Sequence, residues 1–171
     1  MKRDIILSGV GGQGILSIAA VIGRAALEDG LHIKQAEVHG MSQRGGSVVT
    51  YVRYGEKVYS PIIDKGEADI IISFELLEAA RWLGFLKPDG QIVTSTQQID
   101  PMPVITGAAE YPKSLEQKLA TLPIRLDAMD ALGLALQAGS AKAVNLVLLG
   151  RLSRYFHFTD EQWQDAIEKS V

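Results

Sequence analysis

The chain has 171 residues, of which 47% are hydrophobic and 22% are charged, and its net charge is -3. This length suits one domain, residues 1–171, with a proper hydrophobic core, and the composition is ordinary for a soluble globular protein. The small negative charge gives no reason to expect nucleic-acid binding, which usually needs a basic face.

The sequence contains no cysteine. Disulfides, thiol nucleophiles and iron–sulfur clusters held by thiolates of this chain are therefore excluded, and a reducing compartment is favoured. The apolar run at residues 5–7 is too short for a signal peptide, and no run is long enough to span a bilayer. We expect a cytoplasmic protein that does not bind membranes.

The first part of the chain reads as a strand, a glycine turn, a helix and a second strand. Residues 4–9 are expected to form a short buried strand, residues 14–30 a helix and residues 31–37 the next strand. This order is typical of the start of a parallel α/β sheet.

The pattern changes after the second strand. Residues 47–54 and 57–60 are two β-rich runs on either side of Gly55 and Glu56. Glycine at the first central position suits a tight turn, so the two runs are predicted to pair as an antiparallel hairpin.

Strand and helix patterns alternate in the middle of the chain. In chain order, we expect a core strand at 68–74, a helix at 75–86, a strand at 91–96 and a loop or edge segment at 99–112. Between the helix and the second of these strands, the sequence "KPDG" predicts a turn in which Pro88 fixes one dihedral and Gly90 adopts a positive φ.

The last part is expected to contain a helix at 114–121, a strand at 124–127 and helices at 128–139 and 140–156. Asp127 is a candidate cap for the helix that follows it, and Thr159 and Gln162 have the spacing of a capping box that opens a final helix. The helix at 140–156 is apolar over much of its surface. It is either a core helix or an interface helix, and Asn145 within it would need hydrogen-bond partners.

Together these elements predict a Rossmann-like three-layer sandwich. Its sheet is expected to be mostly parallel, with an inserted antiparallel hairpin.

The loop "GVGGQG" matches G-x-G-x-x-G through Gly9, Gly11 and Gly14, after a strand and before a helix. In this context glycines close the turn and let a pyrophosphate approach the helix N-terminus. Glu37 could hold a ribose hydroxyl, although its spacing is a little long for that role. The amide of Gln13 and the hairpin after the second strand argue against ordinary NAD binding. Phosphate or nucleotide binding and a turn that binds nothing both remain open.

A second chemically rich stretch, "EVHGMSQRGGS", runs over residues 37–47. Glu37 and His39 share a face if they lie on a strand, where they form either an acid–base pair or a structural contact. Arg44, followed by two glycines, offers a guanidinium and free backbone N–H groups, which suit a phosphate or a carboxylate. A turn with a solvated arginine is the alternative. The other two histidines, at positions 32 and 157, stand alone, so no metal site is expected.

Several motifs resemble, in order, the small subunit of indolepyruvate ferredoxin oxidoreductase, and more broadly the gamma domain of 2-oxoacid:acceptor oxidoreductases. These motifs are "GVGGQGI", "EVHGMSQRGGSVVTYVRYGEKVYSP", "ADIIISFELLEAAR", "LKPDG" and "AVNLVLLG". The segment "HGMSQRGGSV" is far more specific than the glycine loop, and the resemblance covers essentially the whole chain. The chain differs from this family at Leu76–Leu77, where relatives often have a proline, and at its end, where relatives usually continue. We therefore expect a C-terminal packing element of the family to be missing.

The resemblance implies a subunit that is inactive alone. The holoenzyme would convert a 2-oxoacid, an aryl pyruvate in the indolepyruvate type, with coenzyme A to an acyl-CoA and carbon dioxide, and would pass electrons to ferredoxin. A large partner subunit would carry the thiamine diphosphate and the iron–sulfur clusters, which agrees with the absence of cysteine here.

The resemblance also makes both glycine-bearing loops candidates for contacts with coenzyme A, and it implies no catalytic residue in this chain. The candidate binding residues are Gly9, Gly11, Gly12, Gln13, Gly14, Glu37, His39, Ser42, Gln43, Arg44, Gly45 and Gly46. The alternatives are a gamma subunit for pyruvate, 2-oxoglutarate or branched-chain 2-oxoacids, a stand-alone dinucleotide-binding protein, and a structural or regulatory module.

Overall fold

The computed structural model describes residues 1–41 and 45–171, which form a mixed sheet of six strands in the order β2-β3-β1-β4-β5-β6. The strands are β1 (Lys2–Val10), β2 (His32–His39), β3 (Ser47–Gly55), β4 (Ala68–Ser73), β5 (Leu86–Ser95) and β6 (Arg125–Met129). Strands β1, β4, β5 and β6 are parallel, whereas β3 runs antiparallel to both of its neighbours, β1 and β2.

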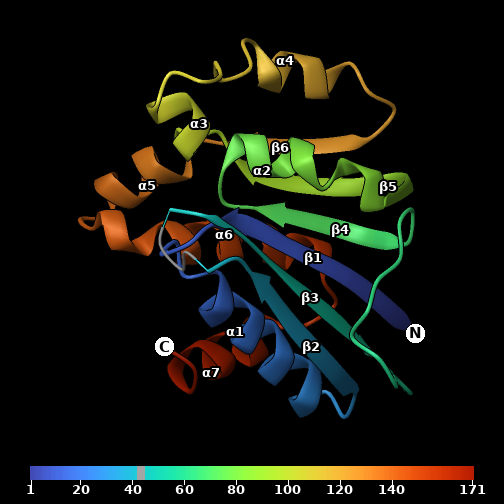
Figure 1. The fold of residues 1–171 in the computed structure, drawn as a ribbon. Helices are drawn as coiled ribbons and strands as arrows, with labels where there is room; N and C mark the ends of the chain where they lie inside the picture. Colours follow the sequence, from blue (N-terminus) through green and yellow to red (C-terminus); the bar gives the residue numbers. More distant parts are fainter. Residues whose placement is uncertain (42–44) are drawn as a thin grey trace.

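Helices cover both faces of this sheet (Figure 1). They are α1 (Ile15–Glu28), α2 (Leu76–Arg81), α3 (Met102–Ile105), α4 (Leu115–Ala120), α5 (Ala131–Gln137), α6 (Val144–Leu152) and α7 (Asp160–Glu168), with short 3-10 turns η1 (Leu83–Phe85), η2 (Ala141–Ala143) and η3 (Ser153–Tyr155). None of the helices in the described ranges is both long and apolar enough to cross a membrane.

Alternation along the central strands explains the three layers. Ile5 and Leu7 of β1 pack against α1, α6 and α7, whereas Ile6 between them packs against α2 and α4 on the other face. In β4, Ile70 and Ile72 face the first group and Ile71 the second. Because both faces are buried, these strands read as continuous apolar runs. The predicted three-layer α/β sandwich is confirmed.

The position of the antiparallel hairpin was predicted wrongly. Residues 57–60 form no strand, and the hairpin consists of β2 and β3. Strand β3 pairs with β1 along its whole length, from Lys2 opposite Gly55 to Val10 opposite Ser47. This pairing buries alternate residues of β3 in the core, an outcome that depends on contacts distant in sequence. The consequence for the sheet is that β1 and β2 are separated by β3 and are not adjacent as in a plain βαβ unit.

Two local predictions were also wrong. Within "KPDG" the positive φ lies at Asp89, at 57°, and not at Gly90. Asp127 does not cap a helix, because β6 continues through Met129, and Asp130 caps α5 by accepting a hydrogen bond from the N–H of Gly133 at 2.8 Å. The other local prediction, the capping box of Thr159 and Gln162 at the start of α7, is confirmed.

Two long segments departed from the elements expected for them. The stretch expected as one helix at 140–156 consists of η2, α6 and η3 in succession, and the loop expected at 99–112 contains the short helix α3.

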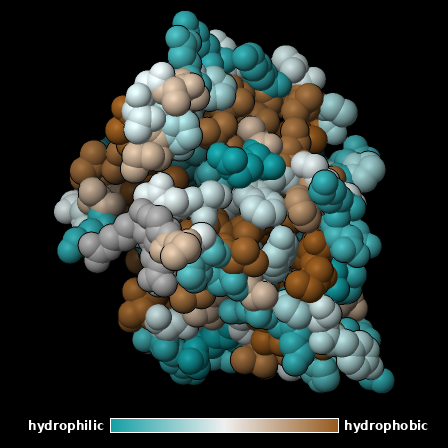
Figure 2. All heavy atoms as spheres, viewed as in Figure 1, coloured by the Kyte–Doolittle hydropathy of each residue, from teal (hydrophilic) through white to brown (hydrophobic). Residues whose placement is uncertain are grey.

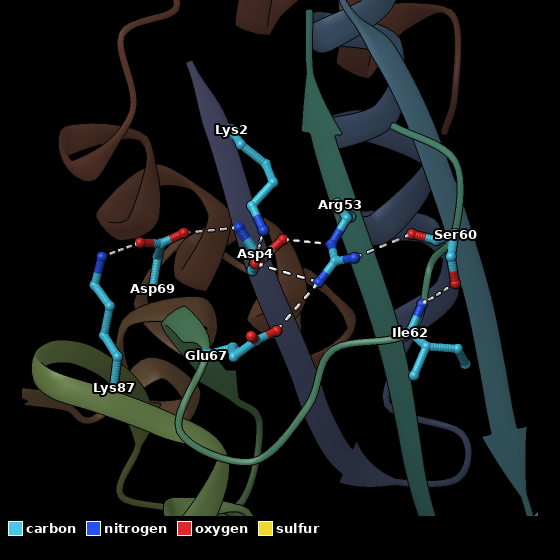
Figure 3. Close-up of polar contacts among 8 residues, drawn as sticks. All are labelled: Lys2, Asp4, Arg53, Ser60, Ile62, Glu67, Asp69 and Lys87. Carbon is cyan, nitrogen blue, oxygen red and sulfur yellow. Dashed lines mark hydrogen bonds and ion pairs between the residues drawn. The ribbon is translucent and has the colours of Figure 1, made fainter. Parts of the chain in front are cut away.

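A buried ion pair joins the amino end of β1 to β3 (Figure 3). The Nε of Arg53 donates to Oδ1 of Asp4 at 2.6 Å, and Asp4 is only 2% exposed. Lys2 lies 3.0 Å from Asp4, and Glu67 lies 3.7 Å from Arg53. Figure 3 also shows Lys87 paired with Asp69 beside this group. The chain after β3 is held here as well, since Arg53 also donates to the carbonyl of Ser60 at 3.5 Å.

Candidate functional site

The glycine loop lies at the carboxyl end of β1 and leads directly into α1 (Figure 1). Gly12 and Gly14 both have positive φ, at 98° and 80°, which side-chain-bearing residues adopt only with strain. Gly14 is the N-cap of α1 and supplies no side-chain cap. The first N–H groups of this 14-residue helix therefore lack a helical partner and point toward the loop, where the helix dipole favours negative charge.

Gln13 braces this loop from within. Its Oε1 accepts a hydrogen bond from the N–H of Val10 at 2.8 Å, and its Nε2 donates to the carbonyl of Phe74 at 3.0 Å. Both ends of the amide are thus engaged by backbone. Gly9 lies beneath, where a Cβ would come within 2.8 Å of Gln13 and Ile15. Gly9 and Gln13 therefore set the shape of the loop.

Glu37 and His39 stand at the end of β2, on the side of the sheet that carries α1. Nδ1 of His39 lies 2.8 Å from the carbonyl of Gly40. Because a carbonyl only accepts, Nδ1 carries a proton and donates in this bond, and in the tautomer with that proton alone Nε2 is an acceptor. This Nε2 lies 4.0 Å from Oε1 of Glu37. The pair forms the wall of a site and is too far apart for a good hydrogen bond.

The second glycine-bearing loop is fastened to the first. The N–H of Gly11 donates to the carbonyl of Gly46 at 2.8 Å, and the N–H of Gly45 donates to the carbonyl of Gly11 at 3.4 Å. These bonds continue the pairing of β1 with β3, so two stretches distant in sequence meet at one edge of the sheet. Ser42, Gln43 and Arg44, which the sequence also singled out, lie outside the described residues.

A pocket of about 240 Å³ opens where these elements converge, and we call it the glycine-loop pocket. Its walls within the described residues are Gly11, Gly12, Gln13, Gly14, Ile15, Leu16, Glu37, His39 and Val48. Six predicted site residues are thereby brought together, and Gly45 and Gly46 are bonded to one of them. Ile15, Leu16 and Val48 were not predicted, because apolar residues at the start of a helix or strand give no signal beyond core packing.

Two buried glutamates of the α2 region support this edge of the sheet and were also not predicted. Glu78 accepts a hydrogen bond at 2.7 Å from the hydroxyl of Ser47, the first residue of β3. Glu75 accepts from the N–H of Ile99 at 3.1 Å and from the hydroxyl of Tyr111 at 2.5 Å. Burial, followed by this bond to Glu75, raises the pKa of Tyr111 well above its usual range. Glu75 thus fastens the segment after β5 to the start of α2.

The surface around the site is mixed in character. Figure 2 shows apolar areas separated by hydrophilic residues on the face drawn in Figure 1. Large apolar side chains that are exposed include Leu16, Val38, Met41, Met102, Ile105, Leu134 and Leu136.

Comparison with known proteins places the chain in a family. The model of the pyruvate ferredoxin/flavodoxin oxidoreductase family matches residues 4–171, and the chain belongs to this family. It is 43% identical to the indolepyruvate oxidoreductase subunit IorB of Thermococcus kodakarensis, over 99% of this chain and 87% of that protein. It is 24% identical to the common gamma subunit of the pyruvate/ketoisovalerate oxidoreductases of the same organism, over 98% of this chain and 85% of that protein.

Solved structures share the fold. Pyruvate oxidoreductase subunit PORC of Thermotoga maritima superposes with a TM-score of 0.73 at 20% identity, covering 99% of this chain and 85% of that one. The 2-oxoglutarate:ferredoxin oxidoreductase of Magnetococcus marinus, whose structure holds 2-oxoglutarate, coenzyme A and succinyl-CoA, gives a TM-score of 0.71 at 20% identity. It covers 96% of this chain but only 26% of that one, so the same fold also occurs as one part of a longer chain. The resemblance seen in the sequence motifs is confirmed.

Proposed function

We propose that this chain is the small subunit of an indolepyruvate-type 2-oxoacid:ferredoxin oxidoreductase. The assembled enzyme would convert an aryl pyruvate and coenzyme A to an acyl-CoA and carbon dioxide, with electrons passing to ferredoxin. The difference in identity within one organism supports the indolepyruvate type, at 43% for subunit IorB against 24% for the common gamma subunit.

In this proposal, the cofactors that carry out the reaction are bound by a partner chain. Thiamine diphosphate would supply carbanion stabilisation, and iron–sulfur clusters would carry the electrons. The donor set here does not fit either cluster or metal binding, since the sequence has no cysteine and the described residues contain no group of three or more His, Asp or Glu arranged for a metal ion. The large thiamine- and cluster-bearing subunit is the proposed partner, and the cytoplasm the proposed location.

The role proposed for this chain is to bind coenzyme A. The observation that carries it is the uncapped N-terminus of α1, which opens into the glycine-loop pocket beside backbone without side chains. Such a site favours a phosphate. Arg44 would add a guanidinium, and the carboxylate of Glu37 and Nε2 of His39 would accept hydrogen bonds from ribose or adenine. None of these residues is assigned a catalytic proton transfer.

An anaerobic purification tests the assembly. The chain, tagged and expressed in its native cells, should co-purify with a large subunit that contains iron and thiamine diphosphate. A colourless chain that elutes alone and binds NAD(P) or flavin tightly would instead identify a stand-alone dinucleotide-binding protein.

Kinetics of the assembled enzyme test the site. Arg44→Ala should raise the KM for coenzyme A by about tenfold, since a charge-assisted bond to phosphate contributes about 1.5 kcal/mol or more. Arg24→Ala is the matched control, because Arg24 lies on the exposed face of α1 and contacts Ser170. A KM that is the same in both variants would favour a purely structural role for this chain.

A further inference from the structure

The glycine loop has a second pocket on its other side. This pocket, of about 290 Å³, also has Gly12 and Gln13 in its wall, so it shares those two residues with the glycine-loop pocket. Among residues 1–41 and 45–171, nothing lies within 4 Å of the position that a Cβ on Gly12 would take. At Gly12, therefore, the wall that the two pockets share is backbone without a side chain, and no other described residue crowds it.

Most polar side chains that line the second pocket are carboxamides, and one, Lys142, is charged. Three carboxamides line it, those of Gln13, Gln97 and Asn145, together with the apolar side chains of Ile99 and Val144. The amide of Gln13 is already engaged by backbone at both ends, which leaves Gln97 and Asn145. A carboxamide both donates and accepts hydrogen bonds without bringing a charge. We call this site the amide pocket.

Asn145 has a free donor. Its Oδ1 accepts from the N–H of Leu146 at 2.8 Å, whereas its Nδ2 makes no hydrogen bond to any of the described residues. The residue is partly exposed and lines the amide pocket. Its Nδ2 lies 2.6 Å from where a Cβ on Gly14 would be, which places the amide directly against the glycine loop.

The backbone that carries Gln97 is held in place from both sides. Its N–H donates to the hydroxyl of Ser95 at 3.2 Å, and its carbonyl accepts from the N–H of Leu76 at 3.0 Å. Two residues on, the N–H of Ile99 is bound by the buried carboxylate of Glu75. The side-chain amide of Gln97 makes no hydrogen bond within the part of the chain that the structure describes. A fixed backbone that carries such an amide is the arrangement of a binding residue.

From these observations, and resting on the coenzyme A site proposed above, we infer that the ligand crosses the glycine loop. Its phosphate-bearing nucleotide lies in the glycine-loop pocket, and its uncharged arm with two amides and apolar methyl groups lies in the amide pocket, bound by Asn145 and Gln97. The apolar walls match the methyl groups of the arm and the carboxamides match its amides. Lys142 at the same pocket defines the competing orientation, in which the phosphates lie on that side.

Calorimetric titration of the assembled enzyme with two probes separates these orientations. The probes are coenzyme A and adenosine 3′,5′-bisphosphate, which lacks the amide-bearing arm. Asn145→Leu and Gln97→Met should each weaken coenzyme A by about tenfold, the effect of one or two lost hydrogen bonds, and leave the bisphosphate within about twofold. Gln98→Met, an exposed neighbour outside the pocket, should change neither affinity.

Any other result of the titrations would overturn the inference, and the pattern of the two affinities would show which part is wrong. Equal losses for both probes would place the phosphates in the amide pocket, and unchanged affinities for both would leave Asn145 and Gln97 without a ligand. If Arg44→Ala weakens both probes in the latter case, the proposed coenzyme A site stands and only the position of the arm is wrong. If the unsubstituted enzyme binds neither probe, the proposed site itself is refuted.

Discussion

Replacing Arg53 by methionine leaves the carboxylate of Asp4 inside the protein without its main partner. Asp4 is 2% exposed and accepts from Arg53 at 2.6 and 3.4 Å, and the remaining cation, Lys2, has a side chain that is 54% exposed. Breaking a buried pair by removing one partner costs about 3 to 5 kcal/mol. Because Lys2 remains, we expect a loss at the lower end, about 3 kcal/mol. For a chain of this length that corresponds to a melting temperature lower by roughly 6 to 12 °C.

Thermal unfolding of the purified chain or complex measures this loss. The double variant Asp4→Leu/Arg53→Met removes both charges, so it should be more stable than Arg53→Met alone. Lys169→Met is the control, because its ion pair with Asp165 is exposed on both sides and should contribute less than about 1 kcal/mol. A double variant less stable than the single one, or a loss from Arg53→Met no larger than that of the control, would refute the reasoning.

Three further predictions concern other parts of the chain. Gln13→Met should lower the free energy of unfolding by about 2 to 3 kcal/mol, measured by urea denaturation, since the Val10 N–H and Phe74 carbonyl both lose their partner. Gly14→Ala should cost about 1 to 2 kcal/mol from its positive φ alone, and a circular dichroism melt as stable as the parent's would contradict this. For Asp127, burial acts to raise the pKa, but the hydrogen bonds from Arg151 and Tyr155 outweigh it and hold the pKa below its ordinary value. The stabilisation from this carboxylate is therefore present above about pH 4 and lost as the pH falls further. Asp127→Asn should make the free energy of unfolding fall less steeply on the acid side. A pH dependence there that matches the parent's would argue against this assignment.

Elements that depend on local sequence were predictable. The helix after the glycine loop follows from apolar spacing, and the capping box at Thr159 and Gln162 follows from the reach of two side chains over one turn. The N-cap of α5, predicted at Asp127 and found at Asp130, could not be decided from local sequence. Both acids precede the same helix, and the choice between them depends on where β6 ends. Pairing of Met129 with Ser95 decides that end, and the local sequence does not report it.

In the candidate site, too, some residues could be predicted from the local sequence, whereas contacts between distant segments could not. The glycine spacing and the pair Glu37 and His39 identified residues that the structure brings into one pocket. The sequence could not show that Gly46 bonds to Gly11, because that contact requires β3 to insert beside β1. The bracing role of Gln13 was hidden for a similar reason, since its partner Phe74 belongs to the end of a strand 61 positions away.

The insertion of β3 beside β1 also determines which residues near the site are fixed by the sheet. His39 is fixed by pairing with Val48, and Gly46 by its bond to Gly11, so both ends of the connecting segment are clamped by the sheet. A one-residue slip of β3 would move Val48 and Val52 from the face covered by α1 to the opposite face, where Val49 now packs, and both sets of contacts would be lost. The register is therefore resistant to change. Glu37 and His39, by contrast, are exposed residues at the end of β2 and line the glycine-loop pocket, so substitutions there leave the core untouched. The wall of the pocket can therefore change in evolution at little cost in folding stability, whereas the strand register that supports it cannot.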